Sequence, residues 1–148
     1  MISVSIANQQ ESLELDFARL KAVAKGVLEG EGISAAKVTF AIMDDDAIHL
    51  LNKRHLDHDE PTDVLTFPYT EPSAKKLQGD VAIGAGVAIV QAAERGHDAH
   101  SELCLYVIHG CLHLCGYDDV EAADRAEMRA KERHYLALFG LPPIAGDE

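Results

Sequence analysis

The apolar residues of this chain change their spacing along the sequence, and this change constrains the fold more than any other feature. Apolar residues alternate with polar or small ones in Ile2–Ile6 and again in Val38–Ile42, which predicts two strands that each bury one face. Between them, apolar residues recur at three- and four-residue steps from Ser12 to about Leu28, which predicts an amphipathic helix ended by two glycines. The N-terminal part therefore alternates strand and helix, with the helix covering the sheet.

The later part of the chain predicts further elements of both kinds. Asp44 to Asp46 supply the N-cap and first-turn carboxylates of a helix that continues to Asn52. Ser101 is expected to cap a strongly apolar helix, Glu102 to about Cys115, that ends at Gly116. The other expected elements are a strand at Asp63–Phe67, a loop at Tyr69–Gly79, a strand at Asp80–Ile83, a helix at Ala85–Arg95 closed by Gly96, and a helix at about Glu121–Phe139. The pattern contains no repeat and no linker, so we expect one domain over residues 1–148.

Composition and charge limit the classes of function. The 148 residues include 47% hydrophobic and 26% charged residues, which are ordinary globular proportions. Lys and Arg number 13 against 25 Asp and Glu, so the formal net charge is −12 and a broad basic nucleic-acid footprint is excluded. The first Lys or Arg is Arg19 and no apolar run nears the ~18 residues of a membrane-spanning helix, so we expect neither a secretory leader nor a membrane span. With three cysteines read as thiols, we expect a cytoplasmic protein without membrane association.

His109 and His113 stand at positions i and i+4 of the predicted apolar helix, so both imidazoles project from one face about one turn apart. This spacing allows two histidines to share one metal ion. Gly116 permits a sharp chain reversal, after which Asp118 or Asp119 can fold back as a third ligand. Three protein ligands and an open position are typical of a catalytic metal site. The alternative is that the two histidines are core residues bonded to the backbone.

The string from His109 to Asp119, HGCLHLCGYDD, resembles the signature His-Gly-x-Leu-His-Leu-x-Gly-Tyr-Asp-His of the YbeY endoribonucleases, which are bacterial metal-dependent rRNA maturation factors. Further stretches similar to this family are Leu51-Asn52, Asp59–Pro68 and Gly79–Ile83. The resemblance implies an α+β fold with a small mixed sheet packed against helices, and one zinc ion per chain in a cleft. It also implies single-strand-directed RNA cleavage in rRNA maturation, ribosome biogenesis and ribosome quality control, with ribosomal RNA and ribosomal or assembly-factor proteins as partners.

Two positions depart from the family pattern, and both departures remove positive charge from the expected site. The family's third histidine ligand falls at Asp119, so the metal ligands expected in this chain are His109, His113 and Asp119. The family usually carries an arginine suited to holding phosphate where this chain has Leu56. A less positive centre should acidify water less and attract a phosphate less strongly. An alternative function is therefore a ribosome-assembly binding factor that keeps the fold and the metal but has lost most catalysis.

The ligand spacing also resembles that of the metzincin metalloproteases. Gly110 stands where those enzymes carry the glutamate that activates water, so proteolysis is the least expected of the three functions. RNA hydrolysis depends less on such a base, because the 2′-hydroxyl of the substrate can itself be the nucleophile. Thr62 and Asp63 enter a predicted strand and are candidates for lining the cleft, with an ordinary turn as the alternative.

The remaining polar candidates have simpler expected roles. Lys75 and Lys76 form the best local basic pair for steering RNA, although such a pair is also typical of a solvated loop. Cys111 and Cys115 each lie two residues from a histidine, so they should face away from the site and pack as small apolar residues. The histidines expected on the solvated surface without a metal role are His49, His55, His58, His97, His100 and His134. No pattern sets the oligomeric state, and we expect a monomer.

Overall fold

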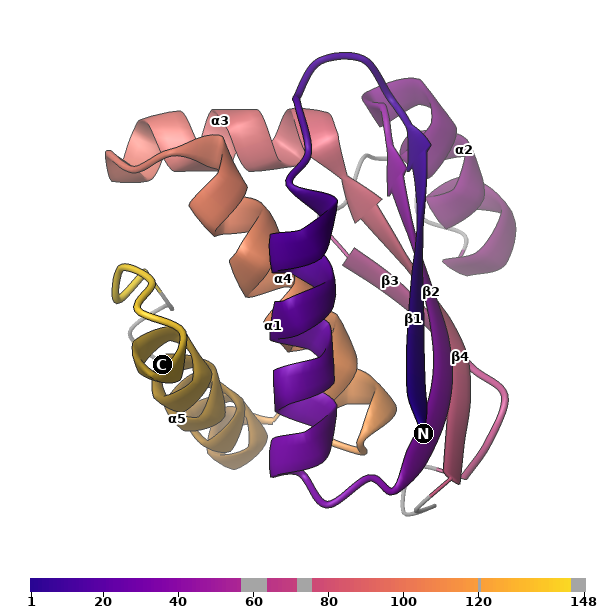
Figure 1. Ribbon diagram of the computed structural model, residues 1–148. Helices are drawn as coiled ribbons and strands as arrows, with labels where there is room; N and C mark the ends of the chain where they lie inside the picture. The colour runs from indigo at the N-terminus through magenta and orange to yellow at the C-terminus, as the bar shows by residue number, and fades with distance from the viewer. Residues whose placement is uncertain (57–63, 72–75, 120, 145–148) are drawn as a thin grey trace.

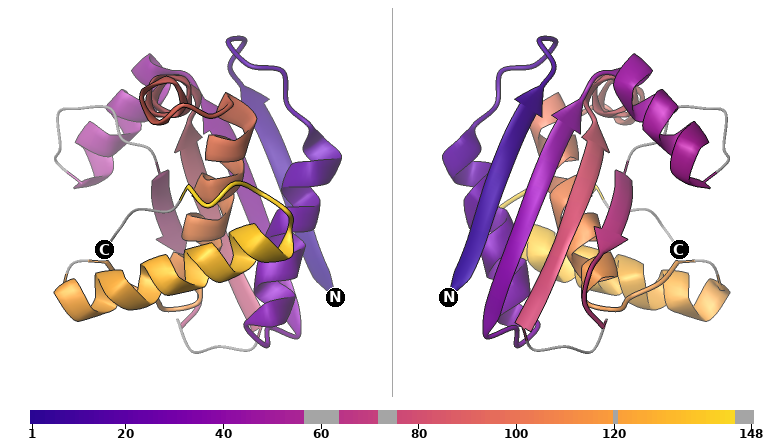
Figure 2. Two further views of the ribbon diagram at one scale, coloured as in Figure 1. Left: turned by 90° about the vertical axis from the view of Figure 1, so that its left-hand side faces the viewer. Right: turned by 90° about the vertical axis from the view of Figure 1, so that its right-hand side faces the viewer.

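The computed structural model describes residues 1–56, 64–71, 76–119 and 121–144, and combines a sheet with helices on both sides (Figures 1 and 2). The strands are β1 (Ile2–Gln9), β2 (Ala35–Met43), β3 (Val64–Pro68) and β4 (Lys76–Gly84). The helices are α1 (Phe17–Gly30), α2 (Asp45–Leu56), α3 (Ala85–Arg95), α4 (Ala99–Leu114) and α5 (Ala122–Leu138). The expected α+β class is confirmed.

The four strands form one mixed sheet in the order β1-β2-β4-β3. β1 and β2 run parallel, as do β2 and β4, whereas β3 pairs with β4 in the antiparallel direction. In this register Phe40 of β2 lies between Ile6 of β1 and Val81 of β4. Because side chains alternate across a strand, these three residues share one face of the sheet. The alternating pattern of the sequence therefore marks the face that α1 and α4 cover.

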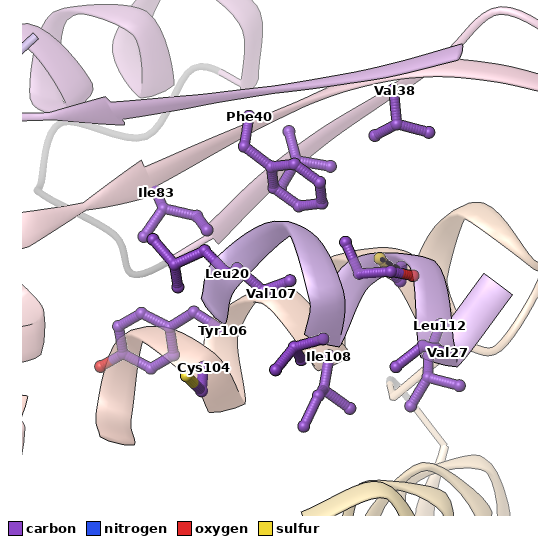
Figure 3. Close-up of a cluster of buried hydrophobic side chains, with 14 of the residues drawn as sticks. Leu20, Val27, Val38, Phe40, Ile83, Cys104, Tyr106, Val107, Ile108 and Leu112 are labelled. Atoms are coloured by element: carbon purple, nitrogen blue, oxygen red, sulfur yellow. Dashed lines mark hydrogen bonds between the residues drawn. The ribbon is translucent and has the colours of Figure 1, made fainter. Parts of the chain in front are cut away.

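The main core lies between this face and helices α1 and α4. Figure 3 shows Phe40 and Ile83 from the sheet beside Leu20 of α1 and Val107 of α4, and all four residues are buried. α4 is an apolar helix that contacts α1, α3, α5 and the strands β3 and β4. A helix that packs on so many sides must be apolar around most of its circumference, as this one is. It is the central element from which the candidate site is built.

One glycine allows α4 to approach the sheet closely. A Cβ atom at Gly110 would lie 2.8 Å from Cγ1 of Val81 and 3.6 Å from Cγ1 of Val64. The first distance is shorter than a normal carbon–carbon contact of about 3.5–4.0 Å. Position 110 therefore faces β3 and β4 rather than solvent, and the absence of a side chain there is a packing requirement.

Local hydrogen bonds set the start of α1, which begins at Phe17 and not at Ser12 as predicted. The side chain of Asp16 accepts a hydrogen bond from the backbone N–H of Arg19 at 3.0 Å and caps the helix. Upstream, the Gln10 side chain holds a turn, because it accepts from the backbone N–H of Leu13 at 2.8 Å and donates to the Leu13 carbonyl at 3.0 Å. The apolar spacing continues through this turn, which explains why the predicted helix was too long.

Two other predicted boundaries are also wrong. The predicted loop Tyr69–Gly79 is too long, since β4 begins at Lys76 and the backbone N–H of Tyr69 donates to the Gln78 carbonyl at 2.9 Å. The cap of α4 is Asp98 rather than Ser101, because the Asp98 carboxylate accepts from the Ser101 backbone N–H at 3.2 Å and from its hydroxyl at 2.5 Å. Ser101 is thus the partner of the cap in the first turn.

The opposite face of the sheet is covered in part by helix α2. α2 lies against β3 and β4 on this face (Figure 2), where Ile48 packs with Leu65 and Ala82 in a smaller apolar cluster. As predicted, Asp44 caps α2, since its carboxylate accepts from the Ala47 backbone N–H at 2.8 Å. Among the described helices, none is long and apolar enough to cross a membrane.

Candidate metal centre

The packing of α4 leaves His109 and His113 at the edge of the core. From Ser101 to Leu114, every residue except these two histidines is buried. After the helix ends, Gly116 has a φ of 105°, a conformation that glycine adopts at little cost. The chain reverses there and returns Asp119 to the two histidines. The predicted reversal is present, and the two histidines project from one face of α4 as predicted.

The three side chains converge on one point. Nε2 of His109 lies 2.9 Å from Nε2 of His113, and Oδ2 of Asp119 lies 3.4 Å and 3.7 Å from these two nitrogens. A tetrahedral zinc ion with ligand bonds of ~2.0–2.1 Å separates its ligand atoms by roughly 3.3 Å. The observed separations bracket that value, so the three donors fit one small divalent cation. Two imidazoles and a carboxylate are also a donor set that zinc accepts.

Asp118, the other carboxylate that the sequence left open, has a different position. Its side chain is exposed, and its Oδ1 accepts a hydrogen bond from the backbone N–H of Asp119 at 2.7 Å. This contact stabilises the turn that presents Asp119. The geometry therefore distinguishes the two neighbouring aspartates, with Asp119 in the cluster and Asp118 in the turn.

A buried glutamate on α5 supports the cluster from behind. Oε2 of Glu132 lies 2.6 Å from Nδ1 of His109, and its Oε1 accepts from Nη1 of Arg129 at 2.6 Å. The side chain of Glu132 is fully buried. Because a carboxylate accepts, Nδ1 of His109 carries the proton and Nε2 is directed toward His113 and Asp119. A carboxylate that orients a histidine in this way is typical of metal sites.

Glu132 was not predicted as a site residue, although the sequence contains a signal for it. The buried residues of α5 are Met128, Glu132, Tyr135 and Leu136, which lie on one face at helical spacing. A glutamate in such an apolar stripe needs a partner, because burying an unpaired carboxylate is costly. The position of that partner, His109 on another helix, is a tertiary contact that the local pattern does not contain.

The same contacts set the protonation of the cluster. Burial lowers the pKa of His109, but hydrogen bonds to Asp119 and Glu132 outweigh this effect and raise it to about 9. The hydrogen bond from His109 is the largest cause that lowers the pKa of Asp119, to about 2. Burial, followed by the nearby charge of His109, lowers the pKa of His113. A proton on His109 therefore competes with a metal ion for the same nitrogen.

The loop of residues 115–119, called here the third-ligand loop because it carries Asp119, is held by a second set of hydrogen bonds. The hydroxyl of Tyr117 donates to Oε1 of Glu31, at the end of α1, over 2.7 Å. Oε2 of Glu31 accepts from the hydroxyl of Tyr135 and from Nζ of Lys131 at 3.2 Å. These contacts connect α1, the loop and α5, so they fix the loop two residues before Asp119.

A small cavity of about 130 Å³ lies beside the cluster. It is lined by residues of α3, α4, α5 and the third-ligand loop, namely Arg95, Leu105, Tyr106, His109, Asp119, Arg129 and Glu132. The candidate ligands His109 and Asp119 thus line a cavity that also carries two arginines. The charge of Arg129 also adds to the lowering of the Asp119 pKa, after the hydrogen bond from His109 and the charges of both histidines.

Several residues named in the sequence analysis lie elsewhere or cannot be placed. Thr62, Asp63, His58 and Lys75 lie outside the described residues, and Lys76 is the first residue of β4. His55 and Leu56 belong to the last turn of α2. Cys111 is fully buried, as expected of a core residue.

His97 was predicted to be solvated, and this prediction is wrong. Its side chain is only 8% exposed, and its Nε2 lies 2.6 Å from Oε1 of Glu102, a fully buried carboxylate near the start of α4. Arg95 reaches the other oxygen of Glu102 at 3.2 Å. A polar sequence neighbourhood therefore did not indicate exposure, because the turn after α3 folds against α4.

A half-buried His-His-Asp cluster beside a cavity, on a helix and loop that pack against a mixed sheet, is an arrangement typical of metal-dependent hydrolases. The sequence matches the family described as Endoribonuclease YbeY over residues 5–140. The chain belongs to the YbeY endoribonuclease family.

Individual relatives agree with this assignment. The chain is 37% identical to the Endoribonuclease YbeY of Moorella thermoacetica, with 93% of this chain and 97% of the relative covered. It is 38% identical to that of Chloroflexus aggregans, with 89% and 93% covered. Among solved structures, the solution structure of a Thermotoga maritima protein matches with a TM-score of 0.69 and 28% identity, over 99% of this chain and 97% of that chain.

Proposed function

We propose that this protein is a zinc-dependent endoribonuclease that cuts single-stranded RNA in rRNA maturation, ribosome biogenesis and ribosome quality control. The observation that carries the proposal is the convergence of His109, His113 and Asp119 within distances that suit one ion. Family membership supplies the substrate class. We further propose that it acts as a cytoplasmic monomer with one domain over residues 1–148, on ribosomal RNA and together with ribosomal or assembly-factor proteins.

The chain supplies the ligands and fixes their orientation. His109 and His113 would bind through Nε2 and Asp119 through Oδ2, while Glu132 holds the proton of His109 on Nδ1. A bound zinc ion supplies a Lewis acid that polarises a phosphoryl oxygen and lowers the pKa of water. The protein's own contribution would be to hold three donors beside a cavity into which a substrate group could enter.

The environment of Gly110 separates nuclease from protease chemistry. In the metzincin arrangement this position carries the carboxylate base, but here a side chain would collide with Val81. A glutamate at this position could not reach the cluster, because position 110 faces the sheet. The chain therefore suits a substrate that needs no carboxylate base at this position, such as RNA with its internal 2′-hydroxyl.

The proposal is tested by cleavage of a short RNA with a fluorescent label. The zinc-loaded protein is expected to cut the single-stranded form, to leave the fully paired duplex largely intact, and to lose activity on addition of a chelator. His113→Ala should abolish cleavage, whereas Asp118→Ala, which alters an exposed neighbour, should retain it. Cleavage that persists in His113→Ala would contradict the proposal.

The competing function is a binding factor with little catalysis, favoured by the aspartate ligand at position 119. It predicts that the zinc-loaded protein binds ribosomal subunits but leaves every single-stranded RNA intact. Asp119→His then offers a direct comparison, because it restores a neutral ligand of the kind the family uses. Cleavage that appears only in Asp119→His would establish the binding-factor reading and reject the nuclease proposal for the natural chain.

A further inference from the structure

Arg129 occupies an unusual position for a surface-helix arginine. It lines the 130 Å³ cavity together with His109 and Asp119, and one of its nitrogens, Nη1, is engaged with Glu132. Its Nε is buried, and among the described residues it has no hydrogen-bond partner. A buried donor without a partner is rare in folded proteins and is destabilising. The guanidinium of Arg129 is therefore not saturated by the protein groups around it.

The two carboxylates that line the cavity are already engaged by other groups of the protein. Both oxygens of Glu132 already have partners, His109 and Arg129, and Asp119 belongs to the metal-binding cluster. Arg95 adds a second guanidinium to the wall and is anchored by the buried Glu102. A guanidinium offers five N–H donors in a fork, so one carboxylate contact leaves others for a further acceptor.

The size of the cavity limits the ligand. Pockets for nucleoside-sized ligands usually have volumes of about 300 Å³ or more, well above the 130 Å³ found here. The space corresponds to about four water molecules at ~30 Å³ each, which suits a compact tetrahedral oxyanion. Arginine is the side chain best matched to the oxygens of such a group.

We infer that Arg129, together with Arg95, forms an anion subsite that holds a phosphate group of the RNA backbone next to the metal centre. This inference rests on the proposed function for the identity of the ligand. Relative to the family pattern, this chain carries less positive charge at positions 56 and 119. The subsite compensates for this difference, because it places two cations, from α3 and α5, at the same cavity. It also explains how a chain with a net charge of −12 can hold a polyanion locally.

The test measures binding rather than turnover. Zinc-loaded protein is titrated at constant ionic strength with two probes, inorganic phosphate and a short single-stranded RNA whose 2′-hydroxyls are methylated to block self-attack. Arg129→Gln is expected to weaken both probes about tenfold, the size of a lost charge-assisted hydrogen bond. Arg95→Gln should weaken them about threefold. Arg133→Gln removes the same charge from an exposed position of α5 and is expected to change neither.

Zinc content is measured for each variant, so that dissociation constants are compared at equal metal occupancy. If Arg129→Gln loses zinc through its contact with Glu132, Arg129→Lys replaces it, since lysine keeps the charge but lacks Nε; about threefold weaker binding is then expected. Equal phosphate affinity in wild type, the Arg129 variant and Arg95→Gln would overturn the subsite. Weaker phosphate binding with unchanged RNA binding would overturn its assignment to the RNA backbone. Cleavage by the wild type decides the proposed function separately.

Discussion

Two fully buried glutamates of this protein, Glu132 and Glu102, each contact one histidine and one arginine. Glu132 on α5 contacts His109 at 2.6 Å and Arg129 at 2.6 Å. Glu102 on α4 contacts a histidine at 2.6 Å and an arginine at 3.2 Å. In both places a carboxylate is stabilised by one imidazole and one guanidinium, which offsets the cost of removing it from water. A buried Glu-His-Arg group alone therefore does not identify a functional site.

The difference lies on the far side of each histidine. His109 contacts Glu132 through Nδ1 and directs Nε2 toward His113 and Asp119. His97 uses Nε2 for Glu102, and it belongs to no metal-binding group that the described residues form. The first group orients a ligand, and the second closes the turn between α3 and α4. The convergence of three donors, rather than a buried charge, distinguishes the candidate site.

The largest contrast is expected between Glu132→Gln and Glu102→Gln. Each substitution neutralises a buried carboxylate, so each should lower the free energy of unfolding of the metal-free protein by about 3 kcal/mol. Only Glu132→Gln should weaken zinc affinity, by about 10- to 100-fold, because the carboxylate that keeps the proton of His109 on Nδ1 is then lost. Zinc affinity is measured by competition with a chromophoric chelator, and unfolding by urea titration.

Equal zinc affinities in these two variants would break the comparison, because Glu132 would then be a structural ion pair like Glu102. A fall in zinc affinity in Glu102→Gln alone would break it in the opposite direction. The matched change of one buried carboxylate in each variant separates orientation of a ligand from general stability.

A second contrast concerns pH. The pKa of His109 is raised from 6.5 to about 9, so its stabilisation of the metal-free protein is complete below pH 6.5 and is lost as the pH rises through 9. The free energy of unfolding should therefore fall by about 3 kcal/mol. This figure includes the His109–Asp119 interaction, so the shift of the Asp119 pKa is not added to it. Zinc replaces this proton, so the loaded protein should show no comparable loss over the same range.

Urea unfolding at pH 6.5 and 9.5, with chelator and with one equivalent of zinc, checks this prediction. His113→Ala serves as the control that cannot use the metal, and its unfolding should depend on pH whether or not zinc is present. A metal-free wild type with the same stability at both values would contradict the role given to the His109 contacts.

The smallest expected effect comes from the third-ligand loop. Tyr117→Phe removes the hydrogen bond to Glu31 without changing the ring, so the free energy of unfolding should fall by about 1 kcal/mol. Zinc affinity should fall a few-fold, because Asp119 is then held less firmly. Tyr69→Phe removes an exposed hydroxyl contact to Asp80 of β4, outside the cluster, and provides a control without an effect on zinc. A tenfold or larger loss would place Tyr117 among the direct determinants of the metal site.

The elements that were predicted well are those defined by local patterns. The strands around Val4 and Phe40 follow period-two alternation, and α3 ends as expected at Gly96, whose φ is 78°. The candidate cluster could be predicted for the same reason, since the spacing of His109 and His113 and the turn after them are local. A helix and one chain reversal are enough to bring Asp119 close to these two histidines.

The features that were missed depend on contacts between distant segments. Glu132 lies 23 residues from His109 in sequence, and its role follows from the packing of α5 against α4. His97 is buried because a turn folds onto Glu102, although its neighbours are polar. The start of α1 depends on a turn made by the side chain of Gln10. None of these contacts is encoded by hydrophobic period alone.

The central claim is that His109, His113 and Asp119 hold one metal ion. The most direct measurement is elemental analysis of untagged protein purified as wild type, Asp119→Ala, Asp119→His and Asp118→Ala. The account predicts about one zinc per chain in wild type, Asp119→His and Asp118→Ala, and loss of zinc in Asp119→Ala. Stoichiometric zinc in Asp119→Ala, or no metal in the wild type, would contradict it.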